Sequence, residues 1–223
     1  MKEVFSNIKT QINNNIFIKN PETTVLGKKI IQESIIMIDE IGFENFTFKK
    51  LGERIASNES SIYRYFESKH KLLVYLSSCY WGWMEYRLVF ETNDIKNPMD
   101  RLKKAIRIVT EKVDDNNTTE HINQAILNQI IIVEFTKTLL TKDVDEENKQ
   151  DYFLVYKRVI YSLAEMIEKT NPNYPFSKSL ASTIVEGALH QHFLKNHLKT
   201  ITDCNDLHSP PEFYVHLTEN LLK

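Results

Sequence analysis

The segment NESSIYRYF, residues 58–66, places side chains that can bond to a nucleic acid beside side chains that belong in a protein core. Asn58 is a good residue to start a helix, and the small hydroxyls of Ser60 and Ser61 would stand in its first turn. A helix that enters the DNA major groove, about 12 Å wide, needs such small or base-bonding side chains near its start. Arg64 could reach a phosphate or a base edge. The chemistry that this stretch predicts is hydrogen bonding to double-stranded DNA.

Two short helices joined by a turn would position these side chains. We expect Thr47 to cap a helix that runs through Ile55, and Asn58 to cap a second helix that ends near Phe66. Two short helices separated by about three residues are a helix-turn-helix signature. Ile62 and Phe66 would pack inward. The expected DNA-contacting residues are Thr47, Lys50, Asn58, Glu59, Ser60, Ser61, Tyr63, Arg64 and Lys69.

The stretch FTFKKLGERIASNESSIYRYFESKHKLL, residues 46–73, resembles the DNA-binding signature of the TetR family of bacterial transcriptional regulators. The resemblance extends over about residues 28–73. It implies a DNA-binding regulator, more often a repressor than an activator, that is a homodimer and is released from a near-palindromic operator by a small molecule. The positions that match the family pattern are Thr47, Leu51, Asn58, Ile62, Tyr63, Phe66, Lys69, Leu72 and Leu73.

The sequence departs from the family pattern in and after the turn. Ala56 stands where the family usually has glycine, so its backbone must either adopt a conformation that favours glycine or turn differently. Ser57 replaces a usual apolar residue. Glu59 is acidic, so it would either accept a hydrogen bond from cytosine N4 or repel phosphate. These departures bear on the operator sequence.

The composition favours an all-α protein. Hydrophobic residues make up 42% of the chain, and only 5 glycines are available for the turns that an all-β fold requires. The net charge of −2 excludes a protein that binds DNA by overall charge, although residues 47–71 hold six basic against three acidic side chains. The prolines all fall between apolar-periodic segments, as expected if those segments are helices: Pro21, Pro98, Pro172, Pro175, Pro210 and Pro211.

The periodicity predicts about nine helices in three regions. These are a flexible N-terminal arm (residues 1–22), a helix-turn-helix DNA-binding domain (23–72) and a larger ligand-binding and dimerisation bundle (73–223). Gly42 is expected to end the first helix with left-handed backbone. The later helices are expected over about residues 69–90, 98–113, 118–140, 143–169, 178–199 and 210–222.

Two further sets of residues follow from the resemblance. In this family the fourth helix links a ligand pocket to the DNA-binding head, which suggests a pocket formed by Tyr80, Trp83, Met84, Tyr86, Phe135 and Tyr156. The alternative is that these residues belong to the core. The last two helices would pair across the two-fold axis, with small residues such as Gly187 permitting close approach. The expected interface residues, which recur near i+4, are Leu180, Ile184, Ala188 and His192.

The sequence gives no reason to expect a cofactor, a metal or catalysis. His190 and His192 are two residues apart, so on a helix their rings point to different faces. Cys79 and Cys204 match no metal or redox spacing, which suggests reduced thiols. No common catalytic fingerprint occurs. With no long apolar run and no leader pattern, we expect a cytoplasmic protein that does not associate with a membrane.

Two other functions fit the same sequence. One is a transcriptional activator of the same fold. The other is a helical small-molecule-binding protein that has no affinity for DNA.

Overall fold

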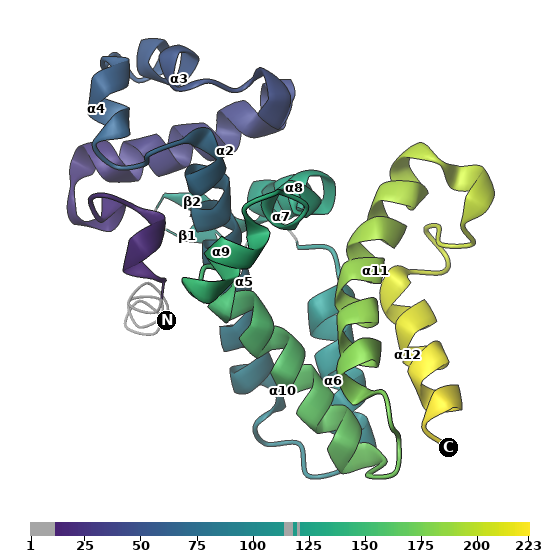
Figure 1. Ribbon diagram of the computed structural model, residues 1–223. Coiled ribbons are helices and arrows are strands. Elements are labelled where there is room, and N and C mark those ends of the chain that lie inside the picture. The colour runs from purple at the N-terminus through teal and green to yellow at the C-terminus, as the bar shows by residue number, and fades with distance from the viewer. Residues whose placement is uncertain (1–11, 114–117, 120) are drawn as a thin grey trace. The chain divides into compact units, whose positions relative to one another are not determined.

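A computed structural model describes residues 12–113, 118–119 and 121–223 (Figure 1). The expected all-α fold is confirmed, because helices dominate these residues and the only strands among them form a two-residue antiparallel hairpin, β1 (Thr118–Thr119) with β2 (Ile122–Asn123). The α-helices are α2 (Val25–Asn45), α3 (Phe48–Arg54), α4 (Glu59–Tyr63), α5 (Lys69–Thr92), α6 (Pro98–Thr110), α7 (Gln124–Glu134), α8 (Thr136–Leu139), α9 (Val144–Lys149), α10 (Leu154–Thr170), α11 (Ser177–His197) and α12 (Pro210–Leu221). Short 3-10 helices are η1 (Asn14–Ile16), η2 (Pro21–Thr23) and η3 (Lys199–Ile201).

The chain divides into two compact units. Unit 1 comprises Met1–Tyr80 and Val113–Leu154, and unit 2 comprises Trp81–Lys112 and Val155–Lys223. Helix α5 begins in unit 1 and ends in unit 2. The segment 23–72, expected to be the DNA-binding domain, lies in the same compact unit as α7, α8 and α9.

Helix α2 is the longest helix of the head and carries its core face. Thr24 caps it by accepting a hydrogen bond from the N–H of Gly27 at 3.0 Å. Ile31 and Ile35, four residues apart, are buried on one face. The left-handed backbone expected at Gly42 is confirmed by its φ of 74°, although the helix resumes for a last short turn to Asn45 after this kink.

Two of the expected helices are each divided in two, and the first of them also starts later. Asn123 accepts hydrogen bonds from the N–H groups of Ala125 at 3.0 Å and Ile126 at 3.1 Å, so α7 begins at Gln124 rather than near residue 118. The helix expected over 143–169 is divided into α9 and α10, with Asp151 at a φ of 60° between them. The cap at Asn123 therefore sets the late start of α7, and the left-handed backbone of Asp151 separates α9 from α10.

The described part of the expected N-terminal arm, residues 12–22, is packed on unit 1. Ile16 in η1 is buried, with 1% of its surface exposed. The N–H of Ile18 donates to the carbonyl oxygen of Tyr65 at 2.8 Å, and the Tyr152 hydroxyl donates to the carbonyl oxygen of Asn15 at 3.0 Å. These bonds tie the segment both to the end of the helix-turn-helix and to the residues after α9.

In unit 2, α11 contacts both α6 and α12, and α12 contacts α6 (Figure 1). The contact between α11 and α12 is close at Gly187, where an added Cβ would lie 2.2 Å from the hydroxyl oxygen of Tyr214. Burial raises the pKa of Tyr214 to about 12, with a further contribution from Cys204. No helix in the described residues has the length and apolarity needed to cross a membrane.

Candidate nucleic-acid interface

The turn between α3 and α4 depends on two small residues. Thr47 caps α3 by accepting a hydrogen bond from the N–H of Lys50 at 3.2 Å. Ala56 has a φ of 54°, so of the two alternatives expected for it, its backbone adopts the conformation that favours glycine. The N–H of Ser57 donates to the carbonyl oxygen of Gly52 at 2.9 Å, and a Cβ at Gly52 would lie 2.8 Å from the Ser57 carbonyl oxygen. The chain can approach α3 this closely because residue 52 is glycine.

Asn58 organises the first turn of α4. Its side-chain oxygen accepts hydrogen bonds from the Ser61 N–H at 2.9 Å, the Ser60 hydroxyl at 2.8 Å and the Ser61 hydroxyl at 2.6 Å. A carbonyl oxygen has two lone pairs, so three donors compete for it. One serine hydroxyl is therefore easily released to another acceptor, and both hydroxyl oxygens keep free lone pairs on the protein surface.

The two sides of α4 and the residues after it differ as predicted. Ile62, Tyr65 and Phe66 are buried, with 0%, 4% and 0% of their surfaces exposed. Tyr63 and Arg64 are exposed. The ring of Tyr63 meets the buried ring of Phe48 edge-on, with centroids 5.0 Å apart, so α3 fixes its position. The helix ends at Tyr63 rather than near residue 66, and Arg64 forms its C-cap.

Four of the six basic residues between 47 and 71 are engaged within the chain. Arg54 pairs with Glu33 at 2.8 Å and with Glu40, and these carboxylates raise its pKa, Glu40 first. The Lys50 ammonium donates to the Asn45 carbonyl oxygen at 2.8 Å. Lys71 donates to the Tyr152 hydroxyl and lies 3.7 Å from the centre of its ring.

Lys69 is the fourth. Its ammonium donates to the carbonyl oxygens of Phe43 at 3.0 Å, Glu44 at 3.1 Å and Phe46 at 3.3 Å. An ammonium has three N–H donors, so all of them are used at the C-terminal end of α2. The phosphate contact predicted for Lys69 would have to displace one of these bonds, and it stays a prediction.

Lys49 and Arg64 are the two basic residues of this stretch whose side chains are not engaged within the described part of the chain. Both side chains are exposed, and neither has a hydrogen bond or ion pair to any residue that the structure describes. Lys49 is absent from the set predicted from sequence, which named Lys50 instead. Two adjacent lysines in the first turn of a helix look equivalent in sequence, and only the position of Asn45 distinguishes them.

The residues expected to line a ligand pocket are divided between the units. Tyr80 and Phe135 lie in unit 1, and both are buried. Asn128 donates to the Tyr80 hydroxyl at 2.9 Å. The other four are in unit 2, where Trp83 and Met84 are buried and Tyr86 and Tyr156 are partly exposed. Their role in a pocket stays a prediction.

The residues expected at a dimer interface are buried inside one chain. Leu180, Ile184, Ala188 and His192 are 6%, 0%, 1% and 8% exposed. The Nε2–H of His192 donates to the Thr110 carbonyl oxygen at 2.7 Å. These side chains face the core of unit 2, so a dimer contact on α11 would have to use its other face. Gly187, expected to permit close approach of a second chain, accommodates Tyr214 of the same chain.

The described residues contain no group of three or more His, Cys, Asp or Glu side chains arranged to hold a metal ion. A helical fold with a capped second helix, exposed hydroxyl and basic side chains and a buried opposite face defines a helix-turn-helix DNA-binding protein. The family model described as "Bacterial regulatory proteins, tetR family" matches residues 30–76. The chain therefore carries a TetR-family domain, which runs from α2 into the first turns of α5.

Solved structures share the fold over most of the chain. The crystal structure of AibR in complex with isovaleryl coenzyme A and operator DNA matches with a TM-score of 0.56 and 15% identity, covering 86% of this chain and 96% of that one. The TetR family transcriptional regulator PfmR from Thermus thermophilus matches with a TM-score of 0.56 and 11% identity, over the same shares. No curated protein sequence matches the chain.

Proposed function

We propose that this protein is a DNA-binding transcriptional regulator whose operator affinity is changed by a small molecule. The observation that carries the proposal is the arrangement of α4 and the residues after it: Ser60, Tyr63 and Arg64 are exposed and Ser61 is partly exposed, while Ile62 and Phe66 are fully buried. A helix that is held in a fixed position and carries small side chains in its first turn can enter a major groove. We take residues 23–72 as the DNA-binding domain.

We assign phosphate binding to the basic side chains that have no partner, or spare N–H donors, among the described residues. Lys49 and Arg64 are exposed and unpaired among the described residues, and Lys50 keeps two of its three donors. The N-terminal N–H groups of α3 add partial positive charge beside Thr47. Glu59 at the start of α4 would accept from cytosine or disfavour other bases.

We propose a homodimer that uses the outer stripe of α12. Leu221 is 45% exposed and Leu217, one turn before it, is partly exposed, so the two form an apolar row at i and i+4. In a DNA-bound dimer of helix-turn-helix proteins the two heads meet successive major grooves about 34–36 Å apart. A regulator of this geometry reads a near-palindromic operator.

Control by a small molecule rests on analogy. AibR, similar in fold, was crystallised with both isovaleryl coenzyme A and operator DNA. In such a regulator a ligand shifts the population between DNA-competent and DNA-incompetent states only by its differential affinity for them. We propose repression as the action, and a change in transcription of the neighbouring genes on deletion distinguishes it from activation.

The experiment that tests DNA binding is fluorescence anisotropy with the DNA upstream of the protein's own gene, titrated at several salt concentrations. Arg64→Ala and Lys49→Ala should each weaken binding and reduce its salt dependence by about one phosphate contact. Lys149→Ala is the matched control, because Lys149 is an exposed lysine in α9 outside the interface. Absence of salt-sensitive binding to every neighbouring promoter would favour the alternative of a small-molecule-binding protein without DNA affinity.

The dimer is tested separately by light scattering. Leu221→Glu should give the mass of a single chain where the unmodified protein gives twice that mass, because a charge would be buried in the apolar row. Leu140→Glu is the control, since Leu140 is 84% exposed in unit 1. A monomeric unmodified protein at micromolar concentration contradicts the proposed operator geometry.

A further inference from the structure

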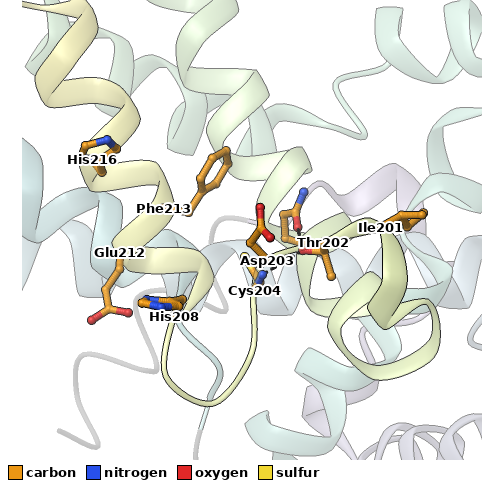
Figure 2. A pocket seen from close by; sticks show the side chains of 9 residues that line it. Ile201, Thr202, Asp203, Cys204, His208, Glu212, Phe213 and His216 are labelled. Atoms are coloured by element: carbon orange, nitrogen blue, oxygen red, sulfur yellow. Dashed lines mark hydrogen bonds between the residues drawn. The ribbon is translucent and has the colours of Figure 1, made fainter.

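A cavity of about 420 Å³ lies in unit 2 beside the connection between α11 and α12 (Figure 2). Its walls are residues 201–204 of the connection, Gln191 of α11, and His208, Glu212, Phe213 and His216. None of these residues belongs to the pocket expected from the sequence. The volume is within the range of small-molecule sites.

The polar groups of one wall are already used within the chain. The Thr202 hydroxyl donates to the side-chain oxygen of Gln191 at 2.6 Å and accepts from the Cys204 N–H at 3.1 Å. Glu212 accepts from the N–H of Ser209 at 2.8 Å and from its hydroxyl at 3.1 Å, in a capping box. This wall is therefore pre-organised, and its carboxylate is committed to the helix start.

Asp203 differs from Glu212. Its carboxylate is exposed and has no hydrogen bond or ion pair to any described residue. Figure 2 shows it on the same side of the connection as the ring of Phe213, which is 45% exposed. An unpaired carboxylate and an aromatic face at one cavity are the two groups that attract an organic cation.

The surrounding charges agree with this reading. The described residues that line the cavity include two carboxylates and no lysine or arginine. Of the basic side chains beside the cavity, Lys195 pairs with Asp206 at 2.9 Å. An anionic ligand would face the carboxylates of Asp203 and Glu212 and no lysine or arginine in the cavity wall.

We infer that this cavity binds a small organic cation with an apolar body, with Asp203 as its counter-ion and Phe213 as its aromatic face. Binding at this site does not depend on whether the head binds DNA. Whether it also changes operator affinity rests on the proposed function.

The test is a titration of the full-length protein, without DNA, by calorimetry or ligand-observed NMR. The probe is benzyltrimethylammonium, compared with neutral N-benzylacetamide and anionic phenylmethanesulfonate. The cation should bind most tightly, and Asp203→Asn should weaken it about fivefold while leaving the affinity for the neutral amide unchanged. Asp203→Glu should restore most of the affinity.

Glu165→Gln is the control, because it removes an exposed negative charge of the same unit from α10, outside the cavity. Thermal melting of each variant checks that it is folded. Equal binding of cation and amide, or an Asp203→Asn protein that binds the cation as well as the unmodified protein does, overturns the inference. Operator anisotropy on the same samples shows separately whether the proposed function holds.

Discussion

The Lys69 ammonium lies 3.0 Å from the carbonyl oxygen of Phe43 and 4.7 Å from the centre of the same residue's ring. One side chain from α5 thus closes the C-terminal end of α2, immediately after the kink at Gly42. Lysine at this position stabilises a helix end through charge-assisted hydrogen bonds and the helix dipole.

The first prediction distinguishes this capping role from a phosphate contact. Lys69→Met should lower the free energy of unfolding by about 2 kcal/mol, because it removes three hydrogen bonds from a charged donor and keeps only the apolar stem. Lys49→Met, at an exposed and unpaired lysine, should change stability by less than about 0.5 kcal/mol and weaken DNA binding instead. Chemical denaturation and operator anisotropy measure the two effects. Unchanged stability in Lys69→Met would return this residue to the DNA interface.

The second prediction concerns the strained turn. Ala56→Gly should raise the free energy of unfolding by about 0.5–1 kcal/mol. The reason is that removing the strain of the left-handed backbone stabilises the folded state by more than the added entropy of glycine stabilises the unfolded chain. Gly52→Ala should act in the opposite direction, because its Cβ would stand 2.8 Å from the Ser57 carbonyl oxygen. Denaturation midpoints of the two variants test this, and a less stable Ala56→Gly protein would contradict it.

The third prediction tests the helix contact in unit 2. Gly187→Ala should cost about 1–3 kcal/mol of stability, because the new Cβ would overlap the Tyr214 hydroxyl oxygen. In a Tyr214→Phe background the nearest remaining atom is the ring carbon Cζ at 3.2 Å, so the same substitution should cost much less. A double-mutant cycle by denaturation gives the coupling energy. Additive effects would mean that Gly187 and Tyr214 are independent.

The fourth prediction is a pH dependence at His192. Burial lowers its pKa, with smaller lowering by Lys195 and Lys112, and the hydrogen bond to the Thr110 carbonyl opposes them. The unfolded chain takes up a proton near pH 6.5 and the folded chain only at lower pH. The contribution of His192 to the free energy of unfolding is therefore fully present above about pH 6.5, and it is lost as the pH falls towards and through the pKa of His192 in the folded protein.

His192→Gln keeps an N–H donor for the Thr110 carbonyl oxygen and removes the titration. Its stability should fall less between pH 7 and pH 5 than that of the unmodified protein, measured by denaturation at each pH. His197→Gln, at an exposed position of the same helix, is the control and should follow the unmodified protein. Identical curves for the two variants would assign the pH dependence to other groups.

Much of the head could be predicted from sequence because its signals are local. The caps Thr47 and Asn58 each bond to an N–H three residues ahead, and the left-handed Gly42 and Ala56 are single-residue properties. The hairpin before α7 was missed because its short strands carry no periodicity that distinguishes them from a helix. Burial of Ile16, within the described residues 12–22, could not be predicted because the asparagine-rich sequence around it has no apolar periodicity.

The sequence by itself determined the helices of the head, the helix-turn-helix and the likeness to the TetR family, since each depends on residues within one or two turns of one another. Only the tertiary structure decided which cations are free. Lys69 is engaged by carbonyl groups more than twenty residues away, and Lys49 is not. It likewise decided that the Ile184 face of α11 is core, and that Asp203 and Phe213 border one cavity. The reason is that burial and hydrogen-bond acceptors distant in sequence compete for each side chain, and that competition has no local signature.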